Sequence, residues 1–296
     1  MSKRIVVFTG AGVSAESGLG TFRDSDGLWE HYRIEDVCTH EAWLRNPQLC
    51  VDFYNARRKD TLAAQPNAAH FAIAKLQAAI PGTRVITQNI DDLHERAGAK
   101  DVVHLHGEIT KLRSERNETA TVPLKGWEQH YGDRHPDGSL LRPYIVFFGE
   151  GVPYFEEACR IAEQAEIMVV IGTSLNVYPA ASLIHYAPAQ CPIYFVDPGQ
   201  PEFGMWADRI THIQKPATIG VPPLVDKLIE DQEKGEHPSE PSHQEQMDAQ
   251  DEALEDEEPD TIAMAMALLV IENTHLREVI HHLRDTISGL TDHNLL

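Results

Sequence analysis

The stretch that decides the fold is Ile5-Val-Val-Phe8-Thr-Gly10-Ala-Gly12-Val-Ser14-Ala15, near the start of the chain. Four apolar residues run directly into a G-x-G-x-x-A loop, a pattern typical of a buried strand, a tight turn and a helix. Glycine lets the backbone approach a pyrophosphate, and we expect the free N–H groups of the following helix to face its negative charge. Alone, such a loop is weak evidence for a dinucleotide, because glycine-rich turns after strands are common.

The rest of the chain alternates short apolar runs with helical patterns. The apolar runs predict parallel strands buried on both faces, at Ile5–Phe8, Arg84–Thr87, Tyr144–Phe148, Ile167–Ile171 and Ile193–Val196. Between most of them lie segments with helical spacing, for instance Ala68–Ala79 and Tyr154–Gln164. This alternation predicts an α/β fold with a doubly wound, Rossmann-like parallel sheet. Residues 31–66 and 108–142 fit it poorly, and we interpret both as parts of a small inserted module.

The charge is concentrated in one tract. The chain has 296 residues and a net charge of −21, which argues against a nucleic-acid partner bound through its phosphates. Residues 231–260 hold 13 acidic residues and one lysine, a net charge of −12. Because three prolines also interrupt this tract, it is predicted to be a disordered linker after a domain at 1–230.

Two absences narrow the class of protein. No run approaches the ~18 apolar residues of a membrane-spanning helix, and the first apolar run is too short for a signal peptide. We therefore expect a cytoplasmic protein without a membrane partner. The four cysteines lie far apart and form no C-x-x-C pair, so neither a sulfur-bound zinc site nor a disulfide scaffold is indicated.

The residue order disfavours a simple dehydrogenase. Such an enzyme places its ribose-binding acid roughly 20 residues after the glycine loop, at the end of the second strand. Here that region, Gly18–Trp29, has the character of an ordered loop. Asp197, at the end of the run Ile193–Val196, is the better candidate for the ribose.

Further motifs follow in order along roughly residues 3–230. They are Gly10-Ala-Gly-Val-Ser-Ala-Glu-Ser-Gly18, Thr21-Phe-Arg23, Gly27-Leu-Trp29, Thr87-Gln-Asn-Ile-Asp91, His104-Leu-His106-Gly107, Arg142-Pro-Tyr-Ile-Val-Phe-Phe-Gly149-Glu150 and Gly172-Thr-Ser174. In this order they resemble the sirtuins, NAD-dependent protein lysine deacylases. Spaced motifs in a fixed order are far more specific than one glycine loop.

The resemblance implies a reaction. In sirtuins the acyl-lysine carbonyl oxygen attacks C1′ of the nicotinamide ribose and expels nicotinamide, and a histidine then deprotonates a ribose hydroxyl. His106 matches that general base, a role that suits a side chain titrating near neutrality. The alternative is a histidine that only closes the turn before Gly107. The implied products are nicotinamide, O-acyl-ADP-ribose and free lysine.

The resemblance also assigns residues to NAD. Asn89 and Asp91 are implied in catalysis beside His106, although Asp91 could instead only cap a helix at Asp92–Ala97. Phe22 and Arg23 match a mobile loop that covers nicotinamide. The implied NAD-binding residues are Gly10, Ala11, Gly12, Ser14, Glu16, Phe22, Arg23, Trp29, Gln88, Asn89, Ile90, Asp91, Gly172, Thr173, Ser174, Asp197 and Ala217. The family often has asparagine where Asp197 stands, but a carboxylate can also accept from ribose hydroxyls.

A second pair of residues bears on the acyl group. Tyr54 and Arg57 lie three apart on a predicted helix and thus share one face. They resemble the Y-x-x-R of sirtuins that remove succinyl and malonyl groups, and an Arg fork matches a carboxylate. The alternative is an exposed helix whose Arg57 and Arg58 are solvated or pair with Asp60. Phe148, Gly149 and Glu150 match further substrate-binding residues.

The family's zinc cysteines are missing. Most sirtuins carry two C-x-x-C pairs after the catalytic histidine, but the first pair here is Ser114-Glu-Arg-Asn117 and the second region has no cysteine. We therefore expect no zinc, with the module held by packing around Leu112, Trp127 and Tyr131. The alternative ligand set is His130, Asp133, His135 and Asp137.

The C-terminal residues show a heptad pattern over 262–290, within a predicted helix at 261–290. Leucines at one seam, isoleucines at the other and the single Asn273 are typical of a parallel two-stranded coiled coil, and hence of a homodimer. The alternative is an amphipathic helix packed on its own domain, because Val270, Ile271 and Val279 widen the apolar stripe.

The sequence as a whole predicts a deacylase with protein acyl-lysines as substrates, acting on succinyl, malonyl and acetyl groups. Two alternatives remain, a protein ADP-ribosyltransferase of the same fold and a non-catalytic NAD-binding scaffold.

Overall fold

The computed structural model describes residues 3–20, 32–175, 177–201 and 203–235. The chain divides into two units, residues 1–239 and 240–296, and only the first contains described residues. The predictions for Phe22, Arg23 and Trp29, for most of the acidic tract and for the heptads at 262–290 therefore lie outside the described residues.

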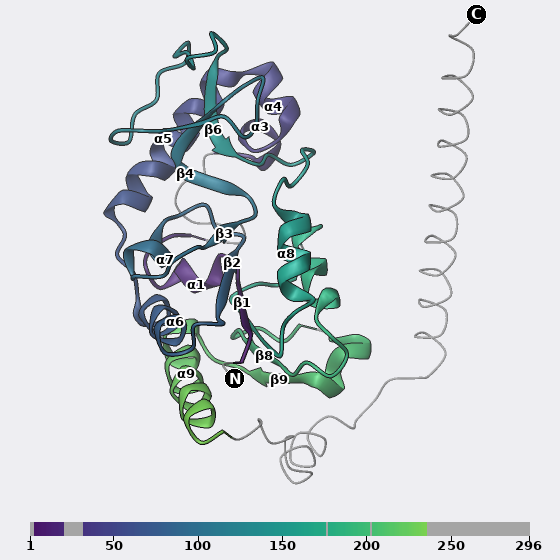
Figure 1. Ribbon diagram of the computed structural model, residues 1–296. Coiled ribbons are helices and arrows are strands. Elements are labelled where there is room, and N and C mark those ends of the chain that lie inside the picture. The colour runs from purple at the N-terminus through teal and green to yellow at the C-terminus, as the bar shows by residue number, and fades with distance from the viewer. Residues whose placement is uncertain (1–2, 21–31, 176, 202, 236–296) are drawn as a thin grey trace, which may run out of the picture. The chain divides into compact units, whose positions relative to one another are not determined.

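A six-stranded parallel sheet forms the centre of the first unit (Figure 1). In spatial order its strands are β3 (Val103–His104), β2 (Arg84–Thr87), β1 (Ile5–Thr9), β7 (Ile167–Ile171), β8 (Ile193–Val196) and β9 (Ile210–Ile213). The chain moves outward from β1 to β3 on one side, then returns to β7 and moves outward to β9 on the other. This confirms the predicted doubly wound, Rossmann-like sheet.

Helices cover both faces of the sheet (Figure 1). Ile5 and Val7 of β1 pack with α6 (Ala68–Ala79) and α9 (Ala217–Glu233), which lie side by side. Val6 and Phe8 point to the other face, against α8 (Phe155–Ala162) and the 3-10 helix η1 (Ala180–Tyr186). The shorter helices are α1 (Gly12–Ala15), α7 (Leu93–Arg96) and the 3-10 helix η2 (Gly204–Arg209). Because both faces are covered, every residue of β1 is buried, as its continuous apolar run predicts.

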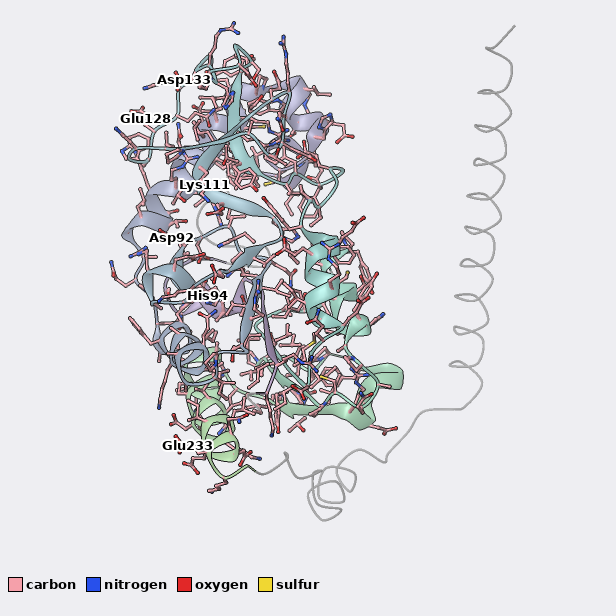
Figure 2. The ribbon with its side chains drawn as sticks, in the orientation of Figure 1. Asp92, His94, Lys111, Glu128, Asp133 and Glu233 are labelled. Carbon is pink, nitrogen blue, oxygen red and sulfur yellow. The ribbon has the colours of Figure 1, made fainter. Side chains whose placement is uncertain are left out.

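The two segments that fit the sheet pattern poorly come together as a small module. It contains α3 (Ile34–Val37), α4 (His40–Arg45), α5 (Pro47–Ala63) and an antiparallel sheet of β5 (Thr121–Pro123), β4 (Gly107–Ser114) and β6 (Leu141–Ile145). Its own apolar core joins α4 and α5 to Ile109 and Phe147. Figure 2 shows Glu128 and Asp133 in the long connection before β6, at the far end of this module from Glu233 of α9.

One strand assignment from the sequence is wrong, and two strands of the parallel sheet were not predicted. The run Tyr144–Phe148 was predicted in the parallel sheet, but it begins in β6, which pairs antiparallel with β4. The run is apolar because Ile145 and Phe147 enter the core of the small module. A strand buried in either core is apolar, so an apolar run does not show which sheet the strand belongs to. The short β3 and the half-buried β9 had no apolar run strong enough to predict them.

Buried polar contacts hold the small module together. Arg58, with no exposed surface, donates from Nε to the Ile109 carbonyl over 2.6 Å and from Nη1 to the Trp127 carbonyl over 2.7 Å. It also donates to Asn55 Oδ1, and Asn55 exchanges two hydrogen bonds with the backbone of Gln129. The alternative of a solvated Arg58 is therefore wrong. Of the predicted packing residues, Leu112 is buried, whereas Tyr131 is 43% exposed.

At the position of the missing cysteines, hydroxyl and carboxylate groups form a compact network. Ser114 Oγ donates to Asp137 Oδ2 over 2.7 Å and lies 2.7 Å from Ser139 Oγ, which donates to Asp137 Oδ1. The backbone N–H groups of Arg116 and Asn117 donate to Ser114 Oγ. Across the described parts of the chain, no His, Cys, Asp or Glu side chains gather in a group able to hold a metal ion. His130, Asp133, His135 and Asp137 accordingly form no such cluster.

The last described element runs past the predicted domain boundary. Helix α9 continues to Glu233, so the first three residues of the predicted linker are helical. Within residues 3–235, apart from the gaps stated above, no helix has the length and apolar character needed to cross a membrane. The predicted cytoplasmic location stays a prediction.

Candidate active site

A cleft of about 570 Å³ opens at the carboxyl ends of the parallel strands, between the sheet and the small module. It lies where the chain reverses direction across the sheet, between β1 and β7, the usual place for a ligand in this kind of fold. The predicted site residues within the described ranges all line it. They are Gly10, Ala11, Gly12, Ser14, Glu16, Tyr54, Arg57, Gln88, Asn89, Ile90, Asp91, His106, Phe148, Gly149, Glu150, Gly172, Thr173, Ser174, Asp197 and Ala217.

The glycine loop is constrained first by its contact with the segment after β7. A Cβ at Gly10 would lie 2.7 Å from the Gly172 carbonyl oxygen, and one at Gly12 would lie 2.7 Å from Gly172 Cα. The N–H groups of Gly12, Val13 and Ser14 donate to backbone carbonyls. The expectation that these helix N–H groups are free for a pyrophosphate is therefore wrong, because the four-residue helix α1 and the close approach of Gly172 use them.

Asn89 and Asp91 are fixed at the floor of the cleft by one serine. Ser14 Oγ accepts from Asn89 Nδ2 over 3.0 Å and donates to Asp91 Oδ2 over 3.0 Å. Asp91 Oδ1 accepts from the N–H of Leu93, the first residue of α7. Burial raises the pKa of Asp91 above its usual value. The N-cap of α7 is Asp92 and not Asp91, so the helix begins one residue later than the capping alternative predicted.

His106 is oriented as a proton acceptor. Its Nδ1 lies 2.9 Å from the Gln88 carbonyl oxygen, which can only accept, so Nδ1 carries the proton and the lone pair lies on Nε2. Burial lowers the pKa of His106 below 6.5, against the opposing effect of the bond to Gln88. A neutral imidazole with an available Nε2 can take a proton from a hydroxyl in the cleft.

His104, two residues earlier, has a different environment. Both of its ring nitrogens face acceptors, with Nδ1 2.9 Å from the Asn89 carbonyl and Nε2 2.8 Å from Glu95 Oε1. Burial alone would lower the pKa of His104, but the hydrogen bond and charge of Glu95 outweigh burial and raise it. His104 therefore holds the Asn89 segment in place and does not line the cleft.

Tyr54 and Arg57 reach the cleft from α5, one turn apart. Tyr54 is 4% exposed, and its ring stacks on Phe147 at 5.5 Å between centroids. Arg57 is half-buried. Cys38, which no motif indicated, lines the same part of the cleft and accepts a hydrogen bond from the Tyr54 hydroxyl.

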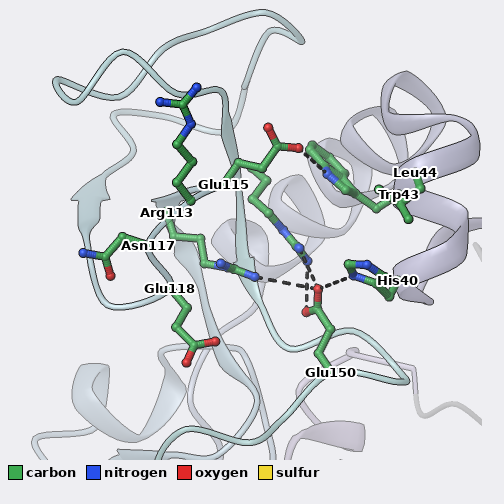
Figure 3. A pocket seen from close by; sticks show the side chains of 10 residues that line it. His40, Trp43, Leu44, Arg113, Glu115, Asn117, Glu118 and Glu150 are labelled. Carbon is green, nitrogen blue, oxygen red and sulfur yellow. Dashed lines mark hydrogen bonds and ion pairs between the residues drawn. The ribbon is translucent and has the colours of Figure 1, made fainter. Parts of the chain in front are cut away.

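Glu150 lines the cleft and also a second pocket, in the small module, which Figure 3 shows. Arg142 donates to both of its carboxylate oxygens, at 2.7 and 3.1 Å, and His40 Nδ1 lies 3.0 Å from Oε1. The Phe147 N–H donates to Oε2. Burial would raise the pKa of Glu150, but the bonds and charge of Arg142 outweigh burial and lower it. Its carboxylate thus orders the wall that carries Phe148.

The opposite end of the cleft is closed by β8 and α9. Asp197 follows β8 and uses Oδ1 to accept from the Gly199 N–H. The Glu16 carboxylate accepts from the Thr218 N–H over 3.0 Å and from its hydroxyl over 2.6 Å. Glu16 therefore ties the glycine loop to the first turn of α9, which begins at Ala217.

Sequence reasoning missed two groups beside the site. Cys38 belongs to no motif, and only the bridge that places its neighbour Thr39 opposite Phe148 could have indicated it. His70 lies 3.4 Å from Ser14 Oγ through Nε2, while its Nδ1 accepts from the Asn67 N–H in a capping box at the start of α6. The spacing Asn67 to His70 was the available signal for that contact.

Comparison with known proteins identifies the family of the chain. The sequence model of the Sir2 family matches residues 10–179. An NAD-dependent protein deacylase of Bacteroides thetaiotaomicron is 49% identical over 232 residues, covering 77% of this chain and 98% of the relative. One from Helicobacter pylori is 44% identical, covering 77% of this chain and 98% of the relative.

Solved structures give the same result. A Sir2 homologue in complex with NAD has a TM-score of 0.68 and 35% identity, covering 79% of this chain and 91% of that chain. An ADP-ribose complex of a mutant Sir2 homologue also has a TM-score of 0.68 and 35% identity, covering 79% and 93%. The family match extends over more than half of the chain and includes most of the residues that line the cleft. The chain therefore belongs to the Sir2 family.

Proposed function

We propose that this protein is an NAD-dependent protein deacylase that removes succinyl, malonyl and acetyl groups from lysine side chains. The observation that carries the proposal is the orientation of His106, whose Nε2 lone pair is available in a cleft that Tyr54 and Arg57 also line. The relatives named above bear the name of NAD-dependent protein deacylase.

The residues of the cleft fit NAD. Amide and carboxyl groups of Gln88, Asn89 and Asp91 lie at one end and can meet the carboxamide and ribose of the nicotinamide half. Asp197 follows β8 and can accept from the hydroxyls of the adenosine ribose. The strand ends at the switch point, with Gly172 against Gly10, form a crevice of the kind that binds dinucleotides.

Bound NAD supplies the ribose carbon to which the acyl oxygen is transferred and the nicotinamide that leaves. Ser14 fixes Asn89 and Asp91 relative to each other, so their polar groups need no rearrangement to orient the ribose. His106 then takes a hydroxyl proton at Nε2, and the Gln88 carbonyl stabilises the imidazolium through Nδ1–H. Phe147 and Phe148 form an apolar wall that limits access of water.

Tyr54 and Arg57 support an acidic acyl group as substrate. The guanidinium can bind a terminal carboxylate with two parallel hydrogen bonds, and the phenol adds a third donor. Acetyl-lysine has no such carboxylate, so it would use the same cleft without this contact.

The test is a panel of acetyl-, malonyl- and succinyl-lysine peptides incubated with NAD and followed by mass spectrometry. We expect nicotinamide, deacylated peptide and O-acyl-ADP-ribose, all abolished by His106→Ala. Transfer of labelled ADP-ribose to protein would instead indicate an ADP-ribosyltransferase. Binding of NAD without any product would indicate a non-catalytic scaffold.

The acyl preference is tested by Arg57→Met. We expect kcat/KM for the succinyl-peptide to fall about ten- to a hundredfold, the range of hydrogen bonds to charged groups. Deacetylation should change less than about threefold. Lys59→Met, which removes a positive charge from the same helix outside the cleft, is the matched control. Equal losses for both peptides would contradict the assignment of Arg57.

A further inference from the structure

Cys38 lines the cleft next to Tyr54 and Arg57, and the reaction described above gives it no role. Its side chain is only 4% exposed, and Tyr54 Oη donates to its Sγ over 3.6 Å. The backbone around it is held on two sides. Cys38 follows α3 directly, and its N–H donates to the carbonyl of Ile34, the first residue of that helix. The Cys38 carbonyl accepts from the Phe148 N–H. The sulfur therefore has a defined position relative to both walls of the cleft.

The Tyr54 ring is equally constrained. It stacks on Phe147 with 16° between the ring planes and meets Phe53 edge-on at 5.1 Å. With the ring held from two sides, the main freedom left to this side chain is the direction of its hydroxyl proton. That direction is set by the acceptor within reach, which is Cys38 Sγ.

We propose that Cys38 is a specificity-determining residue, whose thiol positions the Tyr54 hydroxyl for the terminal carboxylate of an acidic acyl chain. This inference rests on the proposed function of Tyr54 and Arg57. Sulfur is a weak acceptor, so the phenol proton can turn from Sγ to a carboxylate oxygen at small cost.

The protonation state of the thiol suits this role. Burial raises the pKa of Cys38 to about 11, so the group is uncharged at neutral pH. Burial also raises the pKa of Tyr54, which keeps the phenol proton available as a donor. A neutral thiol adds no repulsion toward a carboxylate, and its S–H can donate to the phenol oxygen when that oxygen's own proton turns away.

The experiment compares Cys38→Ala with Cys38→Ser in the full chain, using succinyl- and acetyl-peptides with NAD. We expect Cys38→Ala to raise KM for the succinyl-peptide about three- to tenfold, the effect of one neutral hydrogen bond. Its kcat and its KM for the acetyl-peptide should change less than about twofold. Cys38→Ser, which restores an acceptor, should recover most of the succinyl preference. Cys50→Ala is the matched control, because Cys50 is buried in the same core but does not line the cleft.

A Tyr54→Phe background separates positioning from packing. If Cys38 acts through the Tyr54 hydroxyl, Cys38→Ala has no further effect on the ratio of succinyl to acetyl activity once that hydroxyl is gone. An undiminished effect in this background, or equal changes for both peptides in Cys38→Ala, overturns the proposal. The Arg57→Met variant distinguishes failure of this proposal from failure of the proposed function. If Arg57→Met loses the preference for the succinyl-peptide, the proposed function stands and only the role of Cys38 is in question.

Discussion

At the scale of single residues, hydrogen-bond partners separate side chains that the sequence cannot tell apart. His104 and His106 lie in one motif, yet His104 donates from both nitrogens while His106 keeps one lone pair. The pKa of His104 is raised through Glu95, and burial lowers that of His106. One histidine thus has both ring nitrogens engaged and is structural, and the other keeps a nitrogen able to accept a proton.

The lowered pKa of His106 predicts the pH dependence of activity. A general base acts in its unprotonated form, so a pKa below 6.5 keeps His106 active throughout the neutral range. We expect the acid limb of kcat/KM for the acyl-peptide to have its midpoint below pH 6.5. The measurement is a pH–rate profile at saturating NAD. An acid limb with its midpoint above pH 6.5 would contradict the burial argument.

At the scale of elements, α5 serves two purposes with adjacent arginines. Arg57 faces the cleft, whereas Arg58 is buried and bonds to the carbonyls of Ile109 and Trp127. Burial lowers the pKa of Arg58 to about 10, which still leaves it protonated at neutral pH. A charged group with three acceptors therefore joins α5 to β4 and to the loop that follows β5.

Replacing Arg58 should destabilise the protein. Arg58→Ala leaves two buried carbonyls and the Asn55 amide without their donor, for which we expect a loss of about 2–5 kcal/mol in the free energy of unfolding. Urea denaturation followed by circular dichroism measures it. Asp60→Ala, an exposed neighbour on the same helix, should change stability by no more than about 0.5 kcal/mol. A loss below about 1 kcal/mol for Arg58→Ala would show that packing alone holds the module.

We expect the small module to be stable without a metal, because Ser114, Ser139 and Asp137 form a hydrogen-bonded network at the position of the missing cysteines. Hydrogen bonds from Ser139 and then Ser114 lower the pKa of Asp137 far below its ordinary 3.8. Such a carboxylate stabilises the fold when the pH is above the pKa that the group has in the unfolded chain. This contribution is lost as the pH falls through the lower pKa of the folded protein.

We therefore expect Asp137→Ala to lower the melting temperature at pH 7, because both serine hydroxyls lose their acceptor. A chelator should leave the melting temperature of the unmodified protein unchanged. Calorimetry with and without chelator measures both effects. One equivalent of zinc per chain in elemental analysis of the purified protein would overturn the metal-free interpretation.

At the scale of the whole molecule, the cleft depends on the meeting of segments far apart in sequence. Gly10 contacts Gly172, Glu16 contacts Thr218, and Tyr54 of the small module lines the same cleft as His106. The net charge of −21 also divides at this scale, since −12 belongs to residues 231–260. The acidic excess is thus mostly outside the residues that build the site.

The heptads at 262–290 predict that the full chain is a dimer. Substituting Leu276 and Leu283 by Asp places charges in the predicted apolar seam, which should dissociate the dimer. Sedimentation of the unmodified chain and of the substituted chain at the same concentration measures the mass of each. A monomeric mass for the unmodified chain would favour the alternative, a helix packed on its own domain. Deacylation should be unaffected by the two substitutions.

The sequence alone predicts much of the fold and of the site. Apolar runs and their alternation with helices are local properties, so β1, β2, β7, β8 and α6 follow from them. The predicted site residues that fall in the described ranges all line one cleft. A run such as Tyr144–Phe148 is apolar in either kind of sheet, which is why its sheet could not be assigned.

What the sequence by itself determined is thus the parallel sheet, the glycine turn, the residues that line the cleft and the position of the acidic tract. Only the tertiary structure decided which histidine keeps a free lone pair, which arginine is buried and that a cysteine supports Tyr54. The physical reason is that hydrogen bonding and burial depend on partners distant in the chain, such as Arg58 with Trp127 and Cys38 with Tyr54. Periodicity and spacing report only the neighbours along the sequence.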